Sequence, residues 1–569
     1  MKIEKRARQF LPENLVITDF KVIEPFFNDL LERKISTLED FDGWLADRSE
    51  LDAILEEDLA WRYIRMSIDT QNERLRAAYN DFVTKIQPEL APLEDQLNQK
   101  LVGLPFLDKH QNAAHQIYFR AVRSALDLFR EENISIEAAL NEEAQQYGAI
   151  SAAQTIAHEG KELTMQQAAL LLKEQDEALR KTIFEKIAAR RSQDSNRLHD
   201  LFSSLIQKRH QLAQNAGFKN YRDYKFEAMG RFDYTKDDCF AFHEAIKTHI
   251  VPLVREIQQA KLQLLGKPQF KPWDLDVDPE GKAPLKPFAN GEQMLAGTIR
   301  MFQRIDPYFG ACLQTMEELG HLDLDSKPGK APGGYNYPLY EIGVPFIFMN
   351  AVGSQRDLET MVHEGGHAIH SFLSRDLKLT AFKNLPSEVA ELASMSMELL
   401  SMPQWSEFYP NDIDHKRAMR EQLEGTLKVL PWIAQIDAFQ HWVYENPTHS
   451  IAQRNEYWLQ LSKEFGTGLT DWTGHEDQVT HAWQKQLHLF EVPFYYIEYG
   501  IAQLGALGVW KNSLRDYPQA IDAYKKALSL GYTQSLPEIY KCAGVPFDFS
   551  SKRLQELAEL IQSELKKLQ

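Results

Sequence analysis

The sequence predicts a mainly α-helical protein with a large buried core. Its 569 residues exceed the usual size of a single domain, so we expect two lobes or one large helical body. Between residues 17 and about 145, apolar residues recur every three or four positions, as in the run from Trp61 through Phe82 and Ile86 to Leu93. This spacing is typical of successive amphipathic helices.

Composition narrows the class of function. The formal net charge of −18 argues against nucleic acid as a partner, because nucleic-acid-binding surfaces are usually basic. Three widely separated cysteines, Cys239, Cys312 and Cys542, indicate neither a disulfide framework nor a cysteine-based zinc site. The basic N-terminus is followed by no apolar run, and no stretch is long and apolar enough to span a bilayer. We therefore predict a cytoplasmic protein with no membrane attachment.

The helical pattern changes around residues 149–165. Residues 149–156 and 161–164 are predicted to form a small hairpin, and Thr164 with Gln167 forms a capping box for the next helix. A polar, weakly periodic stretch follows, and we place a domain boundary there. The predicted domains are residues 1–194, an N-terminal helical lobe, and residues 195–569, a catalytic domain. Residues 266–290 are rich in Pro and Asp and read as a connector without a calcium-binding pattern.

A glycine-rich loop at residues 328–335 precedes a short predicted strand at residues 344–350. The loop lacks the residue order of a phosphate-binding P-loop. The strand has bulky, alternating residues. Two interpretations are open for it: an edge strand that pairs with an extended peptide, or a core strand with no free edge.

The stretch from His363 to His370 carries the strongest chemical signal. It contains His-Glu-x-x-His, and on a helix His363 and His367 project from one face, where two imidazoles can hold one zinc ion. Glu364 lies beside the first ligand and is placed as a general base. A chance match would lie on a polar face, whereas this motif is flanked by apolar residues: Leu358, Met361, Val362, Ala368, Ile369, Phe372 and Leu373. Gly365 and Gly366 each cost about 1 kcal/mol inside a helix, which indicates that something approaches the backbone closely.

A third metal ligand is expected from a nearby element, because catalytic zinc keeps three protein ligands and one open position. A helix is predicted to begin near Pro386 and Ser387, and its acidic residues, Glu388, Glu391 and Glu398, fall on one stripe. The alternative is a solvated acidic face. Spacing alone does not choose among the three glutamates.

These two segments resemble the thimet oligopeptidase and oligoendopeptidase F family of zinc metallopeptidases. The resemblance rests on His-Glu-Gly-Gly-His-Ala-Ile-His at residues 363–370 and Val-Ala-Glu-Leu-Ala-Ser at residues 389–394, and length and C-terminal patterns favour the oligoendopeptidase F branch. It implies that Glu391 is the third ligand of one zinc ion per chain, and that Glu388 and Glu398 support the ligands. It also implies a two-lobed helical zincin-like fold, with a small β-sheet beside the active-site helix and a deep central channel that admits short peptides.

The same resemblance assigns residues outside the metal motif. The family has a histidine followed by a tyrosine-rich helix facing the zinc, and His488, Tyr496 and Tyr499 match these best, with Tyr495 as the alternative register. The strand at residues 344–350 is implied to be the substrate-pairing edge strand. The predicted substrate contacts are Gly333, Gly334, Tyr335, Phe346 and Phe348.

The function predicted from sequence is a zinc-dependent endopeptidase that acts on short unstructured peptides. Two alternatives stay open: a zinc exopeptidase of similar fold, and a non-catalytic helical binding protein. The oligomeric state is not predicted.

Overall fold

The structure, a computed structural model, describes residues 3, 5–327 and 329–568 and is mainly α-helical, as predicted. The chain forms two compact units, each assembled from three segments that are distant in sequence. Unit 1 consists of Met1–Asp127, Leu285–Met419 and Ala502–Phe547, and unit 2 of Leu128–Pro284, Arg420–Ile501 and Asp548–Gln569. None of the described helices is long and apolar enough to cross a membrane.

Unit 1 contains two groups of helices and one small sheet. Its N-terminal helices are α1 (Phe20–Glu32), α2 (Leu38–Ile68), α3 (Glu73–Asp81), α4 (Gln87–Gly103) and α5 (Ala113–Leu128). They pack around a core that includes Phe27, Phe41 and Trp44. Its later elements are α12 (Gly291–Ile305), α13 (Pro307–Leu319), β3 (Leu322–Asp325), β4 (Tyr335–Tyr337), β5 (Phe346–Ala351), α14 (Gln355–Ser374), α15 (Ser387–Ser401), α21 (Tyr517–Ser529) and α22 (Leu536–Cys542).

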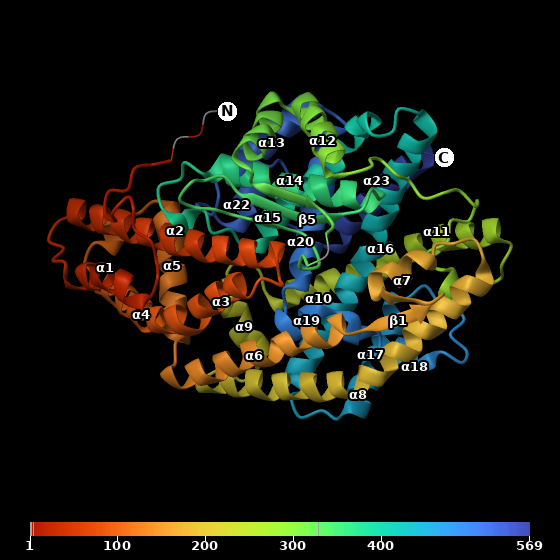
Figure 1. The fold of residues 1–569 in the computed structure, drawn as a ribbon, viewed down its shortest axis with the longest axis horizontal. Helices are drawn as coiled ribbons and strands as arrows, with labels where there is room; N and C mark the ends of the chain where they lie inside the picture. The colour runs from red at the N-terminus through yellow and green to blue at the C-terminus, as the bar shows by residue number, and fades with distance from the viewer. Residues whose placement is uncertain (1–2, 4, 328, 569) are drawn as a thin grey trace. The chain divides into compact units, whose positions relative to one another are not determined.

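The small sheet of unit 1 has the strand order β3-β5-β4 and lies against α14 (Figure 1). β5 pairs with β3 in parallel and with β4 antiparallel, with Tyr335 opposite Phe348. The edge-strand interpretation of residues 344–350 is therefore wrong. Because β5 has a neighbour on each side, it is the core strand, and β3 and β4 form the two edges of the described sheet.

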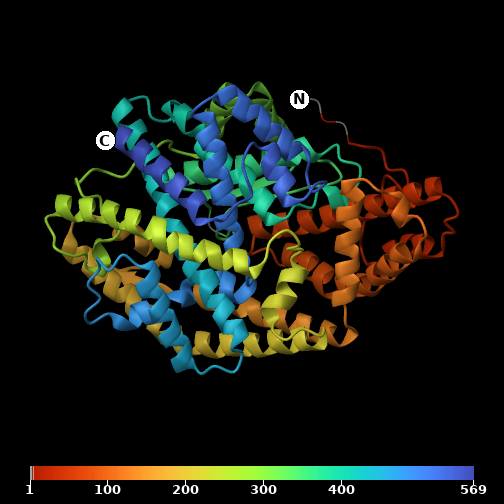
Figure 2. The ribbon, with the colours of Figure 1, turned by 180° about the vertical axis from the view of Figure 1, so that it is seen from behind.

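Unit 2 is built on long helices and one hairpin. Its elements are α6 (Glu131–Ala152), β1 (Thr155–His158), β2 (Lys161–Thr164), α7 (Met165–Leu171), α8 (Glu177–Asn215), α9 (Tyr221–Ala228), α10 (Lys236–Ala245), α11 (Val251–Leu265), α17 (Ile451–Phe465), α18 (Glu476–Thr480), α19 (Leu487–Glu491) and α23 (Ser551–Lys567). α6 and α8 lie side by side (Figure 1). In the view from behind, the blue C-terminal helix α23 lies beside the yellow-green segment that contains α10 and α11 (Figure 2). The helices α16 (Asp412–Glu445) and α20 (Tyr496–Ser513) each contribute several residues to both units.

The predicted hairpin is present, but its first strand begins later than expected. α6 continues to Ala152 because Tyr147 and Ile150 remain on its buried face, so β1 begins only at Thr155. The turn residues Glu159 and Gly160 both have positive φ, as a tight hairpin turn requires. The predicted capping box of Thr164 and Gln167 is confirmed. The domain boundary between residues 194 and 195 stays a prediction, and both residues lie inside α8.

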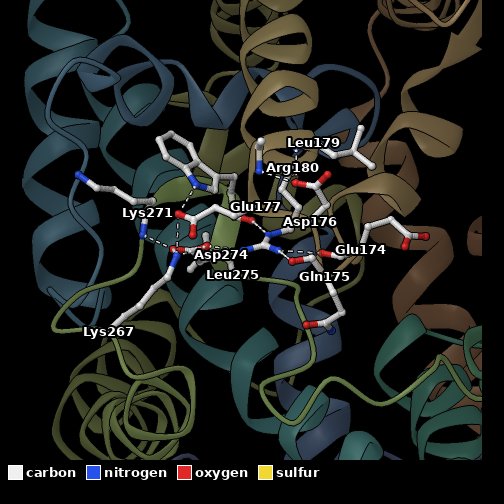
Figure 3. A network of polar contacts seen from close by, with 12 residues as sticks. Glu174, Gln175, Asp176, Glu177, Leu179, Arg180, Lys267, Lys271, Asp274 and Leu275 are labelled. Carbon is white, nitrogen blue, oxygen red and sulfur yellow. Dashed lines mark hydrogen bonds and ion pairs between the residues drawn. The ribbon is translucent and has the colours of Figure 1, made fainter.

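The Pro- and Asp-rich connector is anchored to α8 by a buried polar network (Figure 3). Arg180 donates from Nε to the Trp273 carbonyl over 3.0 Å and from Nη2 to Asp274 Oδ1 over 2.8 Å. Lys267 donates to Asp274 Oδ2 over 2.8 Å. Asp274 is fully buried, so these cations compensate a charge that burial alone would make costly.

Candidate active site

α14 carries the His-Glu-x-x-His motif and begins at a well-formed cap. Ser354 and Asp357 form a capping box, and both residues directly precede the apolar run of the helix. The side chains of His363 and His367 keep 23% and 19% of their surface exposed, whereas Glu364 is buried. The metal-type donors of this helix are therefore accessible, although the helix around them is largely buried.

The two consecutive glycines of α14 allow it to contact its neighbours at backbone distance. A Cβ atom at Gly366 would lie 2.7 Å from Ser394 Cα and 2.8 Å from the Ala393 carbonyl oxygen, both in the backbone of α15. A Cβ at Gly365 would lie 2.7 Å from the Phe302 ring of α12. The close approach predicted from the glycine pair is confirmed, and it brings the acidic stripe of α15 up to the histidines.

Among the three glutamates of α15, the structure brings one to both histidines. Glu391 Oε2 lies 3.4 Å from His363 Nε2 and 3.8 Å from His367 Nε2. Glu398 Oε1 lies 2.7 Å from Nδ1 of His363, on the other side of that ring. A proton held on Nδ1 by Glu398 leaves the Nε2 lone pair directed toward Glu391.

The third glutamate of the stripe, Glu388, is buried, and its backbone carbonyl accepts a hydrogen bond from Tyr540 Oη over 2.8 Å. Its supporting role stays a prediction.

His363, His367 and Glu391 form a group whose ligating atoms fit a metal ion. These atoms all lie within 4.8 Å of one another. Two imidazole nitrogens and one carboxylate oxygen are donors of the kinds that would hold zinc. His370, one turn further along, is not in this group. Its burial lowers the pKa of its imidazole to about 3, so it is a neutral core residue.

The electrostatics of this group favour a bound cation. Burial acts to lower the pKa of His363, but the hydrogen bond to Glu398 and the charges of Glu391 and Glu364 outweigh it and raise that pKa to about 9. Burial and the neighbouring His363 lower the pKa of His367. Burial raises the pKa of Glu364 to about 7. Carboxylates that hold a proton on an imidazole equally attract a divalent cation in its place.

His488 and the three tyrosines form a cluster in unit 2. The His488 ring centroid lies 4.9 Å from that of Tyr496, 5.9 Å from that of Tyr499 and 6.0 Å from that of Tyr495. α20 begins at Tyr496, so Tyr496 and Tyr499 share its first turn while Tyr495 directly precedes it. All three rings surround the histidine, and the choice of register stays a prediction.

The protonation of His488 suits a hydrogen-bond donor. Gln486 donates from Nε2 to His488 Nδ1 over 2.7 Å, which leaves the ring proton on Nε2. Burial lowers the pKa of His488 to about 4, so the ring is neutral near pH 7. Phe494, in the connection between α19 and α20, has φ of +68°. The backbone there adopts a conformation that glycine favours.

The predicted substrate contacts divide into an edge group and a core group. Gly333 and Gly334 lead into β4. The ring of Tyr335 stacks on that of Phe348, with the centroids 4.9 Å apart. Pro328, at the start of the predicted loop, lies outside the described residues. Phe346 and Phe348 are 3% and 0% exposed and pack in the core with Ala60, Ile64 and Leu339. Their burial disfavours direct contact with a peptide.

Asn336, the central residue of β4, was not among the site residues predicted from the sequence. Its side chain donates to the Glu364 carbonyl over 3.5 Å, which links the edge strand to the motif helix. The short Tyr-Asn-Tyr alternation after two glycines was the available signal.

Comparisons with known proteins identify the family. Residues 170–559, more than half of the chain, match peptidase family M3, and residues 10–129 match the peptidase M3 N-terminal domain. The chain belongs to peptidase family M3. The resemblance to the thimet oligopeptidase and oligoendopeptidase F family is thereby confirmed.

Among M3 relatives, the chain is similar to oligopeptidase PepF of Bacillus subtilis, with 21% identity over 412 residues, covering 70% of this chain and 59% of that protein. It is 25% identical over 256 residues to the chromosomal oligoendopeptidase F of Lactococcus lactis subsp. cremoris, covering 42% of each. These matches thus span about half of the relatives' own lengths. PZ peptidase A with inhibitor 2 superposes with a TM-score of 0.90 at 25% identity, over 98% of this chain and 99% of that one. The oligoendopeptidase-F structure from Enterococcus faecium shares the fold, with a TM-score of 0.64 at 14% identity over 96% and 97% of the two chains.

Proposed function

We propose that this chain is a zinc-dependent oligoendopeptidase that hydrolyses internal bonds of short, unstructured peptides. The observation that carries the proposal is the convergence of His363 Nε2, His367 Nε2 and Glu391 Oε2 beside the buried carboxyl of Glu364. Membership of family M3 and similarity to proteins named oligopeptidase and oligoendopeptidase support it.

His363, His367 and Glu391 are the proposed ligands of one zinc ion. Two imidazoles and one carboxylate leave one coordination position open, which is the composition of a catalytic rather than a structural zinc site. When bound, zinc supplies a Lewis acid that makes water a nucleophile at neutral pH and polarises the scissile carbonyl. Glu398 positions His363 through Nδ1, and the contact of Gly366 with α15 sets the distance between the two helices.

Glu364 is the proposed general base and acid. Its raised pKa of about 7 is close to neutral pH, so the carboxylate can accept a proton and later release it. It takes the proton of the attacking water and delivers it to the departing amine.

We further propose that His488, Tyr496 and Tyr499 donate hydrogen bonds to the oxyanion of the tetrahedral intermediate. Support comes from the neutral His488 with its proton on Nε2 and from the tyrosine hydroxyls grouped around it. Tyr495 is the alternative donor if the register differs by one residue.

The edge of β4 is the proposed binding site for the peptide backbone. β4 contacts α14, and its Asn336 reaches the backbone of Glu364. An extended peptide that pairs with this edge would run past the motif helix, with Gly333, Gly334 and Tyr335 as its neighbours. The strand predicted for this role, at residues 344–350, lies one strand further in.

Cytoplasmic location and the absence of nucleic-acid and membrane partners stay predictions from composition.

Hydrolysis of a short internally quenched peptide, blocked at both ends, tests the proposal. We expect internal cleavage, read from product masses, that a chelator abolishes and added zinc restores. Cleavage of only an unblocked peptide at its terminus would instead favour an exopeptidase. Absence of both zinc and cleavage would favour a non-catalytic binding protein.

A further inference from the structure

Unit 2 contains a second group of metal-type side chains, built from two facing helices. Cys239 and His243 are four residues apart on α10, and Asp437 and His441 are four residues apart on α16. Residues at this spacing project from one face of a helix. The ligating atoms of Cys239, Asp437 and His441 all lie within 4.8 Å of one another, and His243 Nε2 lies 2.8 Å from Asp437 Oδ2.

Within the described residues, some buried polar atoms of Asp437 and His441 have no hydrogen-bond partner. Asp437 is 0% exposed and His441 is 2% exposed. Asp437 Oδ1 and both ring nitrogens of His441 have no hydrogen-bond partner in the described part of the chain. Nε2 of His441 lies 3.2 Å from Asp437 Oδ2, but without the geometry of a hydrogen bond. Buried polar atoms are nearly always paired, so three unsatisfied atoms in one group require an explanation.

The surroundings of the group do not supply that explanation. The His441 ring is enclosed by the rings of Phe240, Phe494 and Phe226, with centroids 4.8, 5.4 and 5.9 Å away. Aromatic rings cannot replace water around a carboxylate or around two free imidazole nitrogens. A plain His243–Asp437 hydrogen bond accounts for Oδ2 only. A cation among Cys239, Asp437 and His441 would use Asp437 Oδ1 and one ring nitrogen of His441.

We propose that Cys239, Asp437 and His441 bind a second zinc ion, which links α10 to α16 at a site closed to solvent. The soft thiolate selects zinc over calcium or magnesium. One thiolate and one carboxylate also balance the charge of a divalent cation, which makes its burial possible. On binding, the Cys239 thiol loses its proton to solvent and no redox step occurs. His243 holds Asp437 through Oδ2, the outer contact that orients a carboxylate ligand.

Cobalt(II) is the probe that separates this site from the proposed active site. A thiolate bound to cobalt gives a sulfur-to-metal charge-transfer band in the near ultraviolet, whereas His363, His367 and Glu391 offer only nitrogen and oxygen. The full-length protein, produced in zinc-depleted medium with cobalt(II), is expected to show this band and to contain two metal ions per chain. A His363→Ala/His367→Ala variant is expected to keep the band and one metal ion per chain.

Cysteine variants assign the band. Cys239→Ser is expected to lose it and to retain one metal ion per chain. A Cys312→Ser/Cys542→Ser double variant leaves Cys239 as the only thiol without altering it, so it is expected to keep the band even if Cys239→Ser fails to fold. Wild-type protein with no such band overturns the proposal, and so does a band that disappears in the double variant. Loss of peptidase activity with the band intact would refute the proposed function alone.

Discussion

Two groups of metal-type side chains in this chain share a building unit, a pair of ligands four residues apart on one helix, but differ in their surroundings. His363 and His367 keep about a fifth of their surface exposed and lie beside additional carboxylates. The ring of His441 is enclosed by aromatic rings, and both Asp437 and His441 have almost no exposed surface. We call His363, His367 and Glu391 the open group, and its exposure suits exchange of water and peptide at a metal. We call Cys239, Asp437 and His441 the closed group, and its burial suits a metal that links two helices.

Removal of the proposed general base, Glu364, is expected to have the largest effect, because catalysis is proposed only at the group of His363, His367 and Glu391. Glu364→Gln should lower kcat by about 10²–10⁴-fold with zinc content unchanged, since the amide cannot accept the proton of water. Steady-state hydrolysis of the quenched peptide and metal analysis measure both quantities. Glu359→Gln, the same charge change on the same helix, is the matched control and should retain activity. Near-normal turnover of Glu364→Gln with zinc bound would refute the assignment.

The tyrosines of unit 2 sharpen the comparison, because they test whether a cluster outside the metal ligands takes part in the reaction. Tyr496→Phe or Tyr499→Phe should lower kcat by about 10²–10³-fold, the usual cost of an oxyanion donor, with KM little changed. Tyr495→Phe is the register control and should stay near wild-type activity. The reverse pattern would move the assignment to Tyr495. Equal, small effects in all three variants would leave them as core residues.

Loss of the contact between Glu398 and His363 Nδ1 is expected to lower activity less than the changes above. Added zinc should offset this loss. Glu398→Gln removes the charge that holds the Nδ1 proton of His363 and should weaken zinc binding by about 10–100-fold. Activity should fall at low free zinc and recover at high free zinc, as measured by titration with a metal buffer. An activity loss that added zinc does not reverse would mean that Glu398 acts in the reaction itself.

Local patterns in the sequence predicted the helices, the capping box of Thr164 and the close approach at the glycine pair, because each depends on residues within a few positions. The choice of Glu391 needed the resemblance, since three glutamates share its stripe. Sheet order was not readable from the strand residues, because β3 and β4 both precede β5 in the chain and β5 inserts between them. The group of Cys239 and His441 was missed for a different reason. Its two helical pairs lie far apart in sequence, and each alone resembles an ordinary core pattern.

The smallest expected effect is on the free energy of unfolding. It tests whether the close backbone contact between α14 and α15 at Gly366 sets the geometry of the open group. Gly366→Ala gains about 1 kcal/mol from helix propensity but places a methyl group against Ser394 and Ala393, an overpacking cost of about 1–3 kcal/mol. The net change in the free energy of unfolding should be a loss of about 1 kcal/mol. Gly425→Ala, inside α16 with no atom within 4 Å of its added Cβ, should instead gain about 1 kcal/mol. Denaturant unfolding measures both variants. If Gly366→Ala stabilises the protein as much as Gly425→Ala does, then α14 and α15 can separate freely, and the donor distances between Glu391 and the two histidines are not set by that contact.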